Sequence, residues 1–339
     1  MNEIKHVIVI GASAGGLKAI SEVVSGLPPN LPTAIFVVMQ LSKSSLVNVI
    51  KNHLQKHTSY NCLIPTDGEP ISAGNIYIAP PNQHLLVTPE KIRLTNGPHE
   101  NRWRPSIDVL FRSAAANHNS KVIGIILTGM LDDGTSGMAA IKRSGGICIV
   151  QEPVEAAYPD MPINVINTVD VDYRVSVADM GYIIDDIFSK PPPSEVSIPE
   201  DVKLEAQITE RMVSSIDELA KLGTHSNFTC PDCGGNLWLM KNDKAPRYRC
   251  HTGHVYTEKL LLEKQAEELE ESLWISIRML EERRNLLLNL AYREKEADNQ
   301  QTSSTNAERA EELSMHIERL KALLASVNRN NASPEEGYL

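Results

Sequence analysis

A glycine-rich turn near the start of the chain is the first segment whose residue types could do chemistry. The apolar run Val7–Ile10 leads into Gly11-Ala-Ser13-Ala-Gly15-Gly16, a Gly-x-Ser-x-Gly pattern in a predicted strand-to-helix turn. Small neighbours leave the serine hydroxyl exposed there, and the free N–H groups of the following helix can stabilise an oxyanion. The pattern predicts Ser13 as a nucleophile. The alternative is a turn that binds a dinucleotide phosphate, but the second predicted strand ends in Met39-Gln40-Leu41 rather than in an acidic ribose ligand.

Carboxylates follow another apolar run, Val122–Leu127. The chain continues there as Thr128-Gly-Met130-Leu-Asp132-Asp133-Gly134. Loops at the carboxyl ends of parallel strands are where the sites of open sheets gather. A carboxylate in this loop can orient a catalytic base, or it can simply cap the helix predicted from Thr135. The residues alone leave both interpretations open.

A third cluster combines thiols with imidazole. Cys230-Pro-Asp-Cys233 is followed by Cys250-His-Thr-Gly-His254, the spacing of a structural zinc ribbon in which each pair supplies one edge of a tetrahedron. We expect His254 rather than His251 as the fourth ligand, because adjacent side chains in extended structure point to opposite faces. Four protein ligands leave no open position for water, so the predicted Zn²⁺ is structural and not catalytic.

The sequence up to about residue 189 predicts an α/β domain with a parallel sheet that positions these residues. Short apolar runs alternate there with segments of helical period. Two further segments, Asn75–Ala79 and Lys91–Thr95, look like short strands of a side hairpin or edge region. The predicted central strands are Val7–Ile10, Thr33–Leu41, Val122–Leu127 and Ile147–Val150, and the predicted helices are Gly15–Leu27, Ser44–His57, Pro105–His118, Thr135–Ser144 and Ala178–Ser189.

The rest of the chain is organised differently. We expect a proline-rich linker at 190–202, a helix ending near Gly223 with a zinc ribbon at 203–254, a helical hairpin at 255–327 and a disordered tail at 328–339. The stretch Asp298–Ser304 is the expected turn of the hairpin, with Thr305 and Glu308 as a capping box. Apolar residues step by four and three in both helices, namely Ala266, Leu269, Leu273, Ile277 and Leu280, then Leu313, Ile317, Leu320, Leu324 and Val327. That spacing fits an internal seam and a homo-oligomer interface equally well.

Composition narrows the class of protein. With 42% apolar residues the chain can bury a core, and its longest apolar runs fall short of the roughly 18 residues of a membrane span. A net charge of -10 argues against a nucleic-acid partner. The absence of a leader pattern and five cysteines, three of them in one short stretch, favour a reducing compartment, so we expect a cytoplasmic protein with no membrane insertion.

Four motifs together resemble the catalytic domain of the chemotaxis protein-glutamate methylesterases, the CheB family, over about residues 4–189. They are Gly11–Gly16, Tyr77-Ile-Ala-Pro-Pro81, Arg104-Pro-Ser-Ile-Asp-Val-Leu-Phe111 and Leu127–Gly134. The resemblance implies a three-layer parallel-sheet fold and a serine, a histidine and an aspartate that hydrolyse receptor glutamate methyl esters and deamidate receptor glutamines. By position it assigns Ser13 as nucleophile and Asp133 as the orienting carboxylate. It also places Ala14, Gly15, Met130 and Arg104 around the substrate and oxyanion, and makes methylated or amidated receptor or signalling proteins the partners.

The sequence departs from this family at the base. Gln40 stands where the family's histidine should be, and Trp103 stands where related sequences commonly have histidine. A glutamine cannot accept a proton from Ser13, so we expect activity to be reduced or absent. The alternatives are that His84, His53 or His57 serves as base, or that the chain is an inactive binding protein of a chemosensory-type pathway. Many stand-alone relatives carry such a ribbon and hairpin, so the resemblance also predicts a form without a receiver domain.

Overall fold

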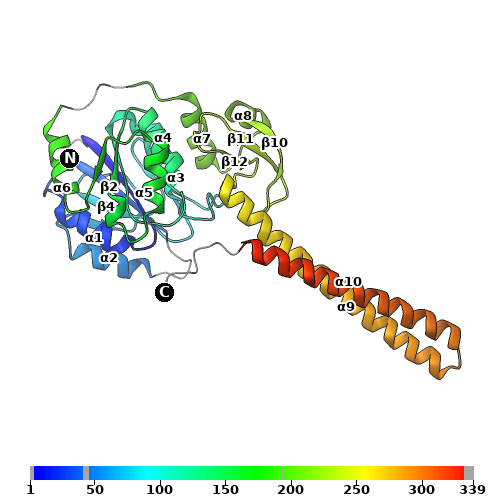
Figure 1. The fold of residues 1–339 in the computed structure, drawn as a ribbon. Coiled ribbons are helices and arrows are strands. Elements are labelled where there is room, and N and C mark those ends of the chain that lie inside the picture. The colour runs from blue at the N-terminus through cyan, green and yellow to red at the C-terminus, as the bar shows by residue number, and fades with distance from the viewer. Residues whose placement is uncertain (1–3, 41–45, 192–193, 195, 332–339) are drawn as a thin grey trace. The chain divides into compact units, whose positions relative to one another are not determined.

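The computed structural model describes residues 4–40, 46–191, 194 and 196–331, the last four of these as backbone alone. The chain divides into two compact units, one of residues 1–258 and one of residues 259–339 (Figure 1). The first unit therefore contains both the α/β domain and the cysteine-rich region.

A seven-stranded parallel sheet forms the centre of the first unit, in the order β3-β4-β2-β1-β7-β8-β9. Its strands are β1 (His6–Ala12), β2 (Thr33–Met39), β3 (Asn61–Leu63), β4 (Asn75–Ile78), β7 (Val122–Ile126), β8 (Ile147–Gln151) and β9 (Tyr173–Val175). The central strands are buried on both faces, which explains their continuous apolar runs.

Helices cover both faces of this sheet, so the predicted three-layer α/β fold is confirmed. Ile8 and Ile10 of β1 pack with the helices of one face and Val7 and Val9 with those of the other, as the alternation of a strand requires. The first face carries α1 (Gly16–Gly26), α2 (Val47–Gln55) and α6 (Met180–Ser189), and the second carries α3 (Ile107–His118), α4 (Thr135–Arg143) and α5 (Asp160–Thr168). Short 3₁₀ turns cover Asn119–Lys121 and Pro153–Glu155.

Strand β1 is the point at which the chain changes direction along the sheet. It pairs with β2 on one side and with β7 on the other, in parallel register at both edges. The carboxyl ends of these three strands therefore lie side by side, which is where ligand sites form in open α/β sheets.

The region between β2 and α3 differs from the sequence-based expectation. Asn75–Ile78 is not part of a side hairpin; it is β4 and lies beside β2 within the main sheet. The strand expected at Lys91–Thr95 is β6 (Ile92–Thr95), which pairs antiparallel with the unpredicted β5 (His84–Val87). The short β3 and β9 and helix α5 were also missed, because elements of three residues or of mixed polarity leave little periodicity.

The remainder of the first unit is helical and then antiparallel. Two helices, α7 (Glu200–Arg211) and α8 (Ile216–Leu222), replace the single helix expected before Gly223. The chain breaks between them because Met212 adopts φ 59° and Ser215 forms a capping box with Glu218. A four-stranded sheet follows, made of β10 (Gly223–Thr229), β11 (Asn236–Met240), β12 (Arg247–Cys250) and β13 (Val255–Thr257).

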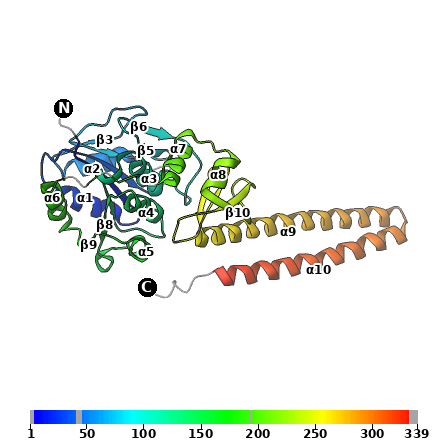
Figure 2. The ribbon, with the colours of Figure 1, turned by 90° about the horizontal axis from the view of Figure 1, so that it is seen from above.

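The second unit is a helical hairpin, as predicted. Helices α9 (Glu258–Glu296) and α10 (Gln300–Asn331) lie antiparallel and side by side (Figure 2). Their heptad positions pack within the chain, which fits the internal seam; the seam joins Leu273, Ile277, Leu280, Ile317, Leu320 and Leu324.

Two details of this hairpin correct the expectation. The turn is shorter than Asp298–Ser304, because α10 begins at Gln300 and Thr305 donates to the Gln301 carbonyl inside the helix instead of capping it. Of the tail expected to be disordered, residues 328–331 continue α10, and residues 332–339 lie outside the described residues. No helix of the described residues has the length and apolar character to cross a membrane.

Candidate active site and metal centre

Ser13 lies directly after β1, where the first turn of α1 begins. Its N–H donates to the Thr128 carbonyl beyond β7 at 3.0 Å, which fixes the turn against the neighbouring strand. Gly15 has φ +74°, and a Cβ there would come within 3.1 Å of Ala157, so the turn requires glycine. A Cβ on Gly129 would come within 2.9 Å of the Ser13 Cβ, so glycine at both positions leaves space around the serine.

Backbone amides near this serine are free to bind an anion. Within the described parts of the chain, the N–H groups of Ala14, Gly15 and Met130 donate no hydrogen bond, whereas Gly16 and Gly129 donate to Ser13 and Tyr158 carbonyls. The Met130 side chain is 51% exposed. Free amides beside a serine at the start of a helix have the arrangement that an oxyanion hole requires.

Gln40 follows β2 and connects to the loop beyond β7. Its N–H bonds to the Ala12 carbonyl at 3.0 Å, which places it beside the end of β1. The side-chain Nε2 donates to Asp133 Oδ2 at 2.6 Å, and Gln40 is only 7% exposed. The Oε1 atom is buried, and no group of the described residues donates a hydrogen bond to it. Gln40 thus makes with Asp133 the contact that an orienting aspartate makes with a catalytic histidine.

Asp133 is 2% exposed and receives several hydrogen bonds besides that of Gln40. Two come from the first backbone N–H groups of α3, at Ile107 and Asp108, and two from the side chains of Asn101 and Ser106. Four of these five donors are N–H groups, and all five converge on two oxygens. We therefore treat Asp133 as an ionised carboxylate, although burial raises its pKa.

Asp108 forms a buried carboxylate pair with Asp133. Asn101 Nδ2 donates to both, at 2.8 Å to Asp108 Oδ2 and at 3.1 Å to Asp133 Oδ1. Burial, followed by the proximity of Asp133, raises the pKa of Asp108 to about 8. The two carboxyl groups therefore titrate as a coupled pair that holds a proton at neutral pH.

An open hollow of about 620 Å³ faces these residues. Ser13 and Gln40 line it together with Lys18 of α1 and two histidines, His53 of α2 and His57 just beyond it. The two imidazole rings lie 4.8 Å apart between centroids. The sequence placed both histidines on a surface helix and left them as alternative bases. The fold brings them to the same hollow as the serine.

Two other predicted residues are held by the protein itself. Both ring nitrogens of buried His84 are engaged, Nε2 with the Pro98 carbonyl at 2.8 Å and Nδ1 with the Ser106 N–H at 3.3 Å. Burial lowers the pKa of His84 to about 4. All three guanidinium nitrogens of Arg104 donate to the loops at Asn82 and at 96–97. His84 and Arg104 thus secure the loops around α3.

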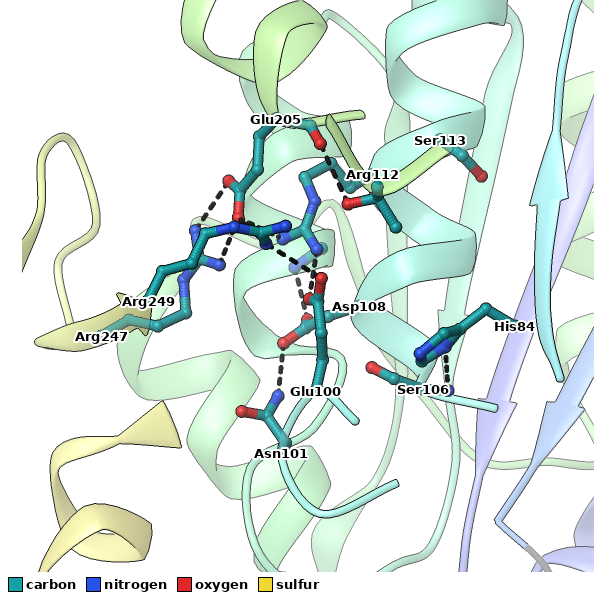
Figure 3. A network of polar contacts seen from close by, with 12 residues as sticks. His84, Glu100, Asn101, Ser106, Asp108, Arg112, Ser113, Glu205, Arg247 and Arg249 are labelled. Atoms are coloured by element: carbon teal, nitrogen blue, oxygen red, sulfur yellow. Dashed lines mark hydrogen bonds and ion pairs between the residues drawn. The ribbon is translucent and has the colours of Figure 1, made fainter. Parts of the chain in front are cut away.

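A buried ionic network lies next to Asn101, on the side toward the cysteine-rich sheet. Figure 3 shows Glu100 and Glu205 surrounded by Arg112 of α3 and by Arg247 and Arg249 of β12. All five side chains are at most 7% exposed. Although burial alone would raise it, the Arg112 and Arg247 guanidinium groups hold the pKa of Glu205 below its usual range. The network ties the cysteine-rich sheet to the α/β domain.

The predicted metal ligands converge in the cysteine-rich sheet. The sulfur atoms of Cys230, Cys233 and Cys250 and a ring nitrogen of His254 lie within 4.8 Å of one another. Cys230 Sγ and Cys250 Sγ lie 3.7 and 3.6 Å from His254 Nδ1, and Cys233 Sγ lies 3.7 Å from Cys250 Sγ. A tetrahedral zinc ion with bonds of about 2.3 Å separates its sulfur ligands by about 3.8 Å. These three separations match those around such an ion, and His251 is not part of the cluster.

Some site residues were missed by the sequence argument. Asp108 stands inside a quoted motif, and Asn101 stands two residues before Trp103, but neither was given a role. Glu100, Glu205 and the three arginines carry no pattern at all, since their pairing depends on chain segments up to 149 residues apart.

Comparison with known proteins agrees with this geometry. Residues 8–184, about half of the chain, match the sequence model of the CheB methylesterase family. The chain belongs to the CheB methylesterase family. The catalytic domain of the Thermotoga maritima CheB methylesterase is similar in structure, with a TM-score of 0.52 and 29% sequence identity over 53% of this chain and 97% of that domain.

Sequence relatives of the CheB family point the same way. A protein of Leptospira interrogans is 37% identical over 171 residues, which cover 50% of this chain and 88% of the relative. The protein-glutamate methylesterase/protein-glutamine glutaminase 2 of Xanthomonas oryzae is 36% identical over 161 residues, and the match covers 44% of that protein. The match to the family model ends before the cysteine-rich sheet and the hairpin.

Proposed function

We propose that this chain is a protein-glutamate methylesterase and glutamine deamidase class protein that binds methylated or amidated side chains of chemoreceptor-like signalling helices at Ser13. Ser13 is the nucleophile, the amides of Ala14, Gly15 and Met130 bind the oxyanion, and hydrolysis is slow or absent because no base takes the serine proton. The observation that carries this proposal is the 2.6 Å hydrogen bond from Gln40 Nε2 to Asp133.

The argument rests on what a carboxamide can do at that position. An imidazole oriented by a carboxylate accepts the serine proton and later returns it to the leaving group. The Gln40 amide keeps the contact with Asp133 but has no basic nitrogen. Neither His84, whose two nitrogens are engaged, nor the Arg104 guanidinium can take over the proton. The imidazoles of His53 and His57 line the same hollow and are the remaining candidates for a base.

A second candidate function is recognition without turnover, and the Gln40 oxygen favours it. Because the Asp133 carboxylate accepts from Nε2, the amide orientation is set and Oε1 is left as a buried acceptor. A buried acceptor without a partner is costly, and a ligand that donates an N–H there removes that cost. A glutamine side chain has such a donor, whereas a methyl ester has none. A binding protein of this design prefers the amidated form of its target.

The cysteine-rich sheet has a structural role in this proposal. Cys230, Cys233, Cys250 and His254 would hold Zn²⁺ with no position left for water or substrate. The ion would stabilise a small sheet that has little core of its own. Three free thiolate ligands also need a reducing compartment, so we propose that the protein works in the cytoplasm.

Methanol release from a methylated receptor cytoplasmic fragment tests the function. We assay four proteins in parallel: the unaltered chain, Gln40→His, Ser13→Ala and Gln40→His/Ser13→Ala. We expect little or no turnover by the chain and a gain of roughly 10² to 10⁴-fold in Gln40→His, the usual contribution of a general base. Ser13→Ala should abolish that gain.

Two outcomes separate the candidates. Turnover by the unaltered chain that Ser13→Ala removes would show that another group acts as base, and His53→Gln and His57→Gln would then identify it. Recognition without turnover would be favoured if neither the chain nor Gln40→His released methanol and if the chain bound the amidated fragment more tightly than the methylated one.

A further inference from the structure

Asn101 lies between the buried carboxyl pair of the candidate active site and the cysteine-rich sheet, and it contacts both. It is 2% exposed, and its side-chain amide bridges the buried pair Asp108 and Asp133. Figure 3 shows its contact with Asp108. A donor shared by two buried carboxyl groups fixes their positions relative to each other. Asp133 in turn orients the Gln40 side chain.

The turn that carries Asn101 has an unusual backbone conformation at its tip. Glu100 and Trp103 close it through two backbone hydrogen bonds of 3.3 and 2.9 Å. The two residues at its tip, Asn101 and Arg102, have φ values of 52° and 68° in the left-handed region. Asparagine tolerates this region, but arginine adopts it at a cost, so the surroundings must help to fix the turn.

The cysteine-rich sheet supplies that support. The Asn101 N–H donates to the Val255 carbonyl of β13 at 3.0 Å, and Glu100 forms a parallel bridge with Val255. Arg249 of β12 also donates to Glu100 Oε1 at 3.0 Å. Both sides of the turn are therefore fixed by the sheet that carries the metal ligands.

Val255 directly follows His254, the last ligand. The segment between Cys250 and His254 is a tight turn, with the Cys250 N–H on the His254 carbonyl at 3.0 Å. A metal ion bound by both residues would lock this turn and with it the position of the Val255 carbonyl. Without the ion only hydrogen bonds hold the turn.

We propose that Asn101 is a positioning residue through which the metal-bound ribbon sets the geometry of Asp133. The proposal rests on the zinc site proposed above but concerns a different property, the coupling between that site and the catalytic loop. Loss of the metal, or a partner that pulls on the ribbon, loosens the turn at Asn101 and releases one of the donors of Asp133. By thermodynamic reciprocity, a ligand at the Ser13 hollow that depends on Asp133 also tightens metal binding.

Nuclear magnetic resonance of backbone amides tests this coupling. The Ile107 and Asp108 N–H groups bind the Asp133 carboxylate at 2.8 and 3.2 Å, so their chemical shifts report its position. We compare the zinc-loaded chain, whose stoichiometry is confirmed by native mass spectrometry, with the chelated chain. Chelation should speed hydrogen exchange at Asn101 by about tenfold or more and should shift the Ile107 and Asp108 amides. Unchanged exchange at Val7–Ile10 of β1 shows that the domain stays folded.

Asn101→Gly is the decisive variant, because glycine keeps the left-handed backbone and the N–H bond to Val255 but removes the side-chain amide. In this variant chelation should still loosen the turn, while the Ile107 and Asp108 amides should no longer respond. An equal response in Asn101→Gly, or none in the unaltered chain, overturns the proposal.

Arg249→Met provides a test that needs no metal. It removes the ion pairs of Arg249 with Glu100 and Glu205, while Glu100 keeps Arg112 and its backbone bridge to Val255. We expect faster exchange at Asn101 and shifts at Ile107 and Asp108 in the same direction as chelation. If native mass spectrometry finds no bound zinc, the proposed metal is wrong, and Arg249→Met alone decides whether the ribbon positions Asp133.

Discussion

Gln40 donates its side-chain N–H to Asp133 across 2.6 Å, between the ends of two strands that flank β1. A carboxylate with this many buried donors is arranged to stabilise a positive or hydrogen-donating partner. The contact resembles the one by which an aspartate orients a catalytic histidine, but the donor here is an amide. The proposed function therefore predicts that the single substitution Gln40→His supplies the base.

The first prediction concerns what the restored site needs. In Gln40→His, the imidazole should depend on Asp133 for its orientation and tautomer, because the carboxylate already binds a donor at that position. We expect Gln40→His/Asp133→Asn to lose most of the methanol release gained by Gln40→His, which is a loss of roughly 10² to 10⁴-fold in turnover. Equal rates in the single and double variants would mean that Asp133 only caps α3.

The sequence predicted the central strands of this fold because they are buried on both faces and read as continuous apolar runs. It misplaced Asn75–Ile78, since the apolar pattern of a four-residue strand does not tell an edge hairpin from the main sheet. The Gly-x-Ser-x-Gly turn after a predicted strand indicated Ser13, whereas the roles of Gln40 and Asp133 came from the resemblance to the CheB family. Asn101 could not be found, since its role depends on a backbone contact with Val255, 154 positions later.

A second prediction is a pH-dependent loss of stability that originates at His84. Burial lowers its pKa to about 4 in the folded chain, below the value of about 6.5 in the unfolded chain. Below pH 6.5 the unfolded chain therefore binds more protons, and the free energy of unfolding should fall by about 3 kcal/mol between pH 6.5 and 4 through this residue. Urea unfolding measured across that range should show a smaller slope in His84→Gln.

The matched control for His84 is His57→Gln, which changes an exposed histidine. This variant should keep the slope of the unaltered chain. A slope that is the same in His84→Gln and the unaltered chain would show that His84 accepts a proton without leaving its buried position.

A third prediction concerns the buried ionic network. Glu205→Gln leaves Arg247 and Arg112 with less negative charge in a site that water does not reach, so we expect a loss of about 3 to 5 kcal/mol in the free energy of unfolding at pH 7. Because the pKa of Glu205 is depressed in the folded chain, its contribution is present above about pH 4.3 and lost as the pH falls further. The difference between the two chains should therefore shrink in acid.

Glu200→Gln, on the same helix but with a side chain 91% exposed, should change the stability by less than about 0.5 kcal/mol. Denaturant unfolding at pH 7 and at pH 3.5 measures both variants. A small effect of Glu205→Gln at pH 7 would mean that the arginines are held by Glu100 and Asp243 alone.

A fourth prediction separates the two neighbouring histidines of the ribbon. His254→Ala removes one of the four converging ligand atoms, whereas His251→Ala changes an exposed residue outside the cluster. We expect the first variant to lose zinc to a chelator that leaves the second and the unaltered chain fully loaded, as native mass spectrometry would show. Retention of zinc by His254→Ala with loss by His251→Ala would reassign the fourth ligand.

The fifth prediction concerns the seam of the helical hairpin. Ile317 is 1% exposed in the cluster with Leu273, Ile277 and Leu324, whereas Met315 on the same helix is 52% exposed. An aspartate at position 317 would bury a charge between α9 and α10, so Ile317→Asp should lower the stability of the hairpin by about 3 kcal/mol or more. Met315→Asp should change it by less than about 0.5 kcal/mol. Circular dichroism at 222 nm during heating measures both, because the two helices hold a large share of the helical residues. A loss in Met315→Asp that matches Ile317→Asp would mean that the outer face of α10 is also covered in solution, as in a homo-oligomer.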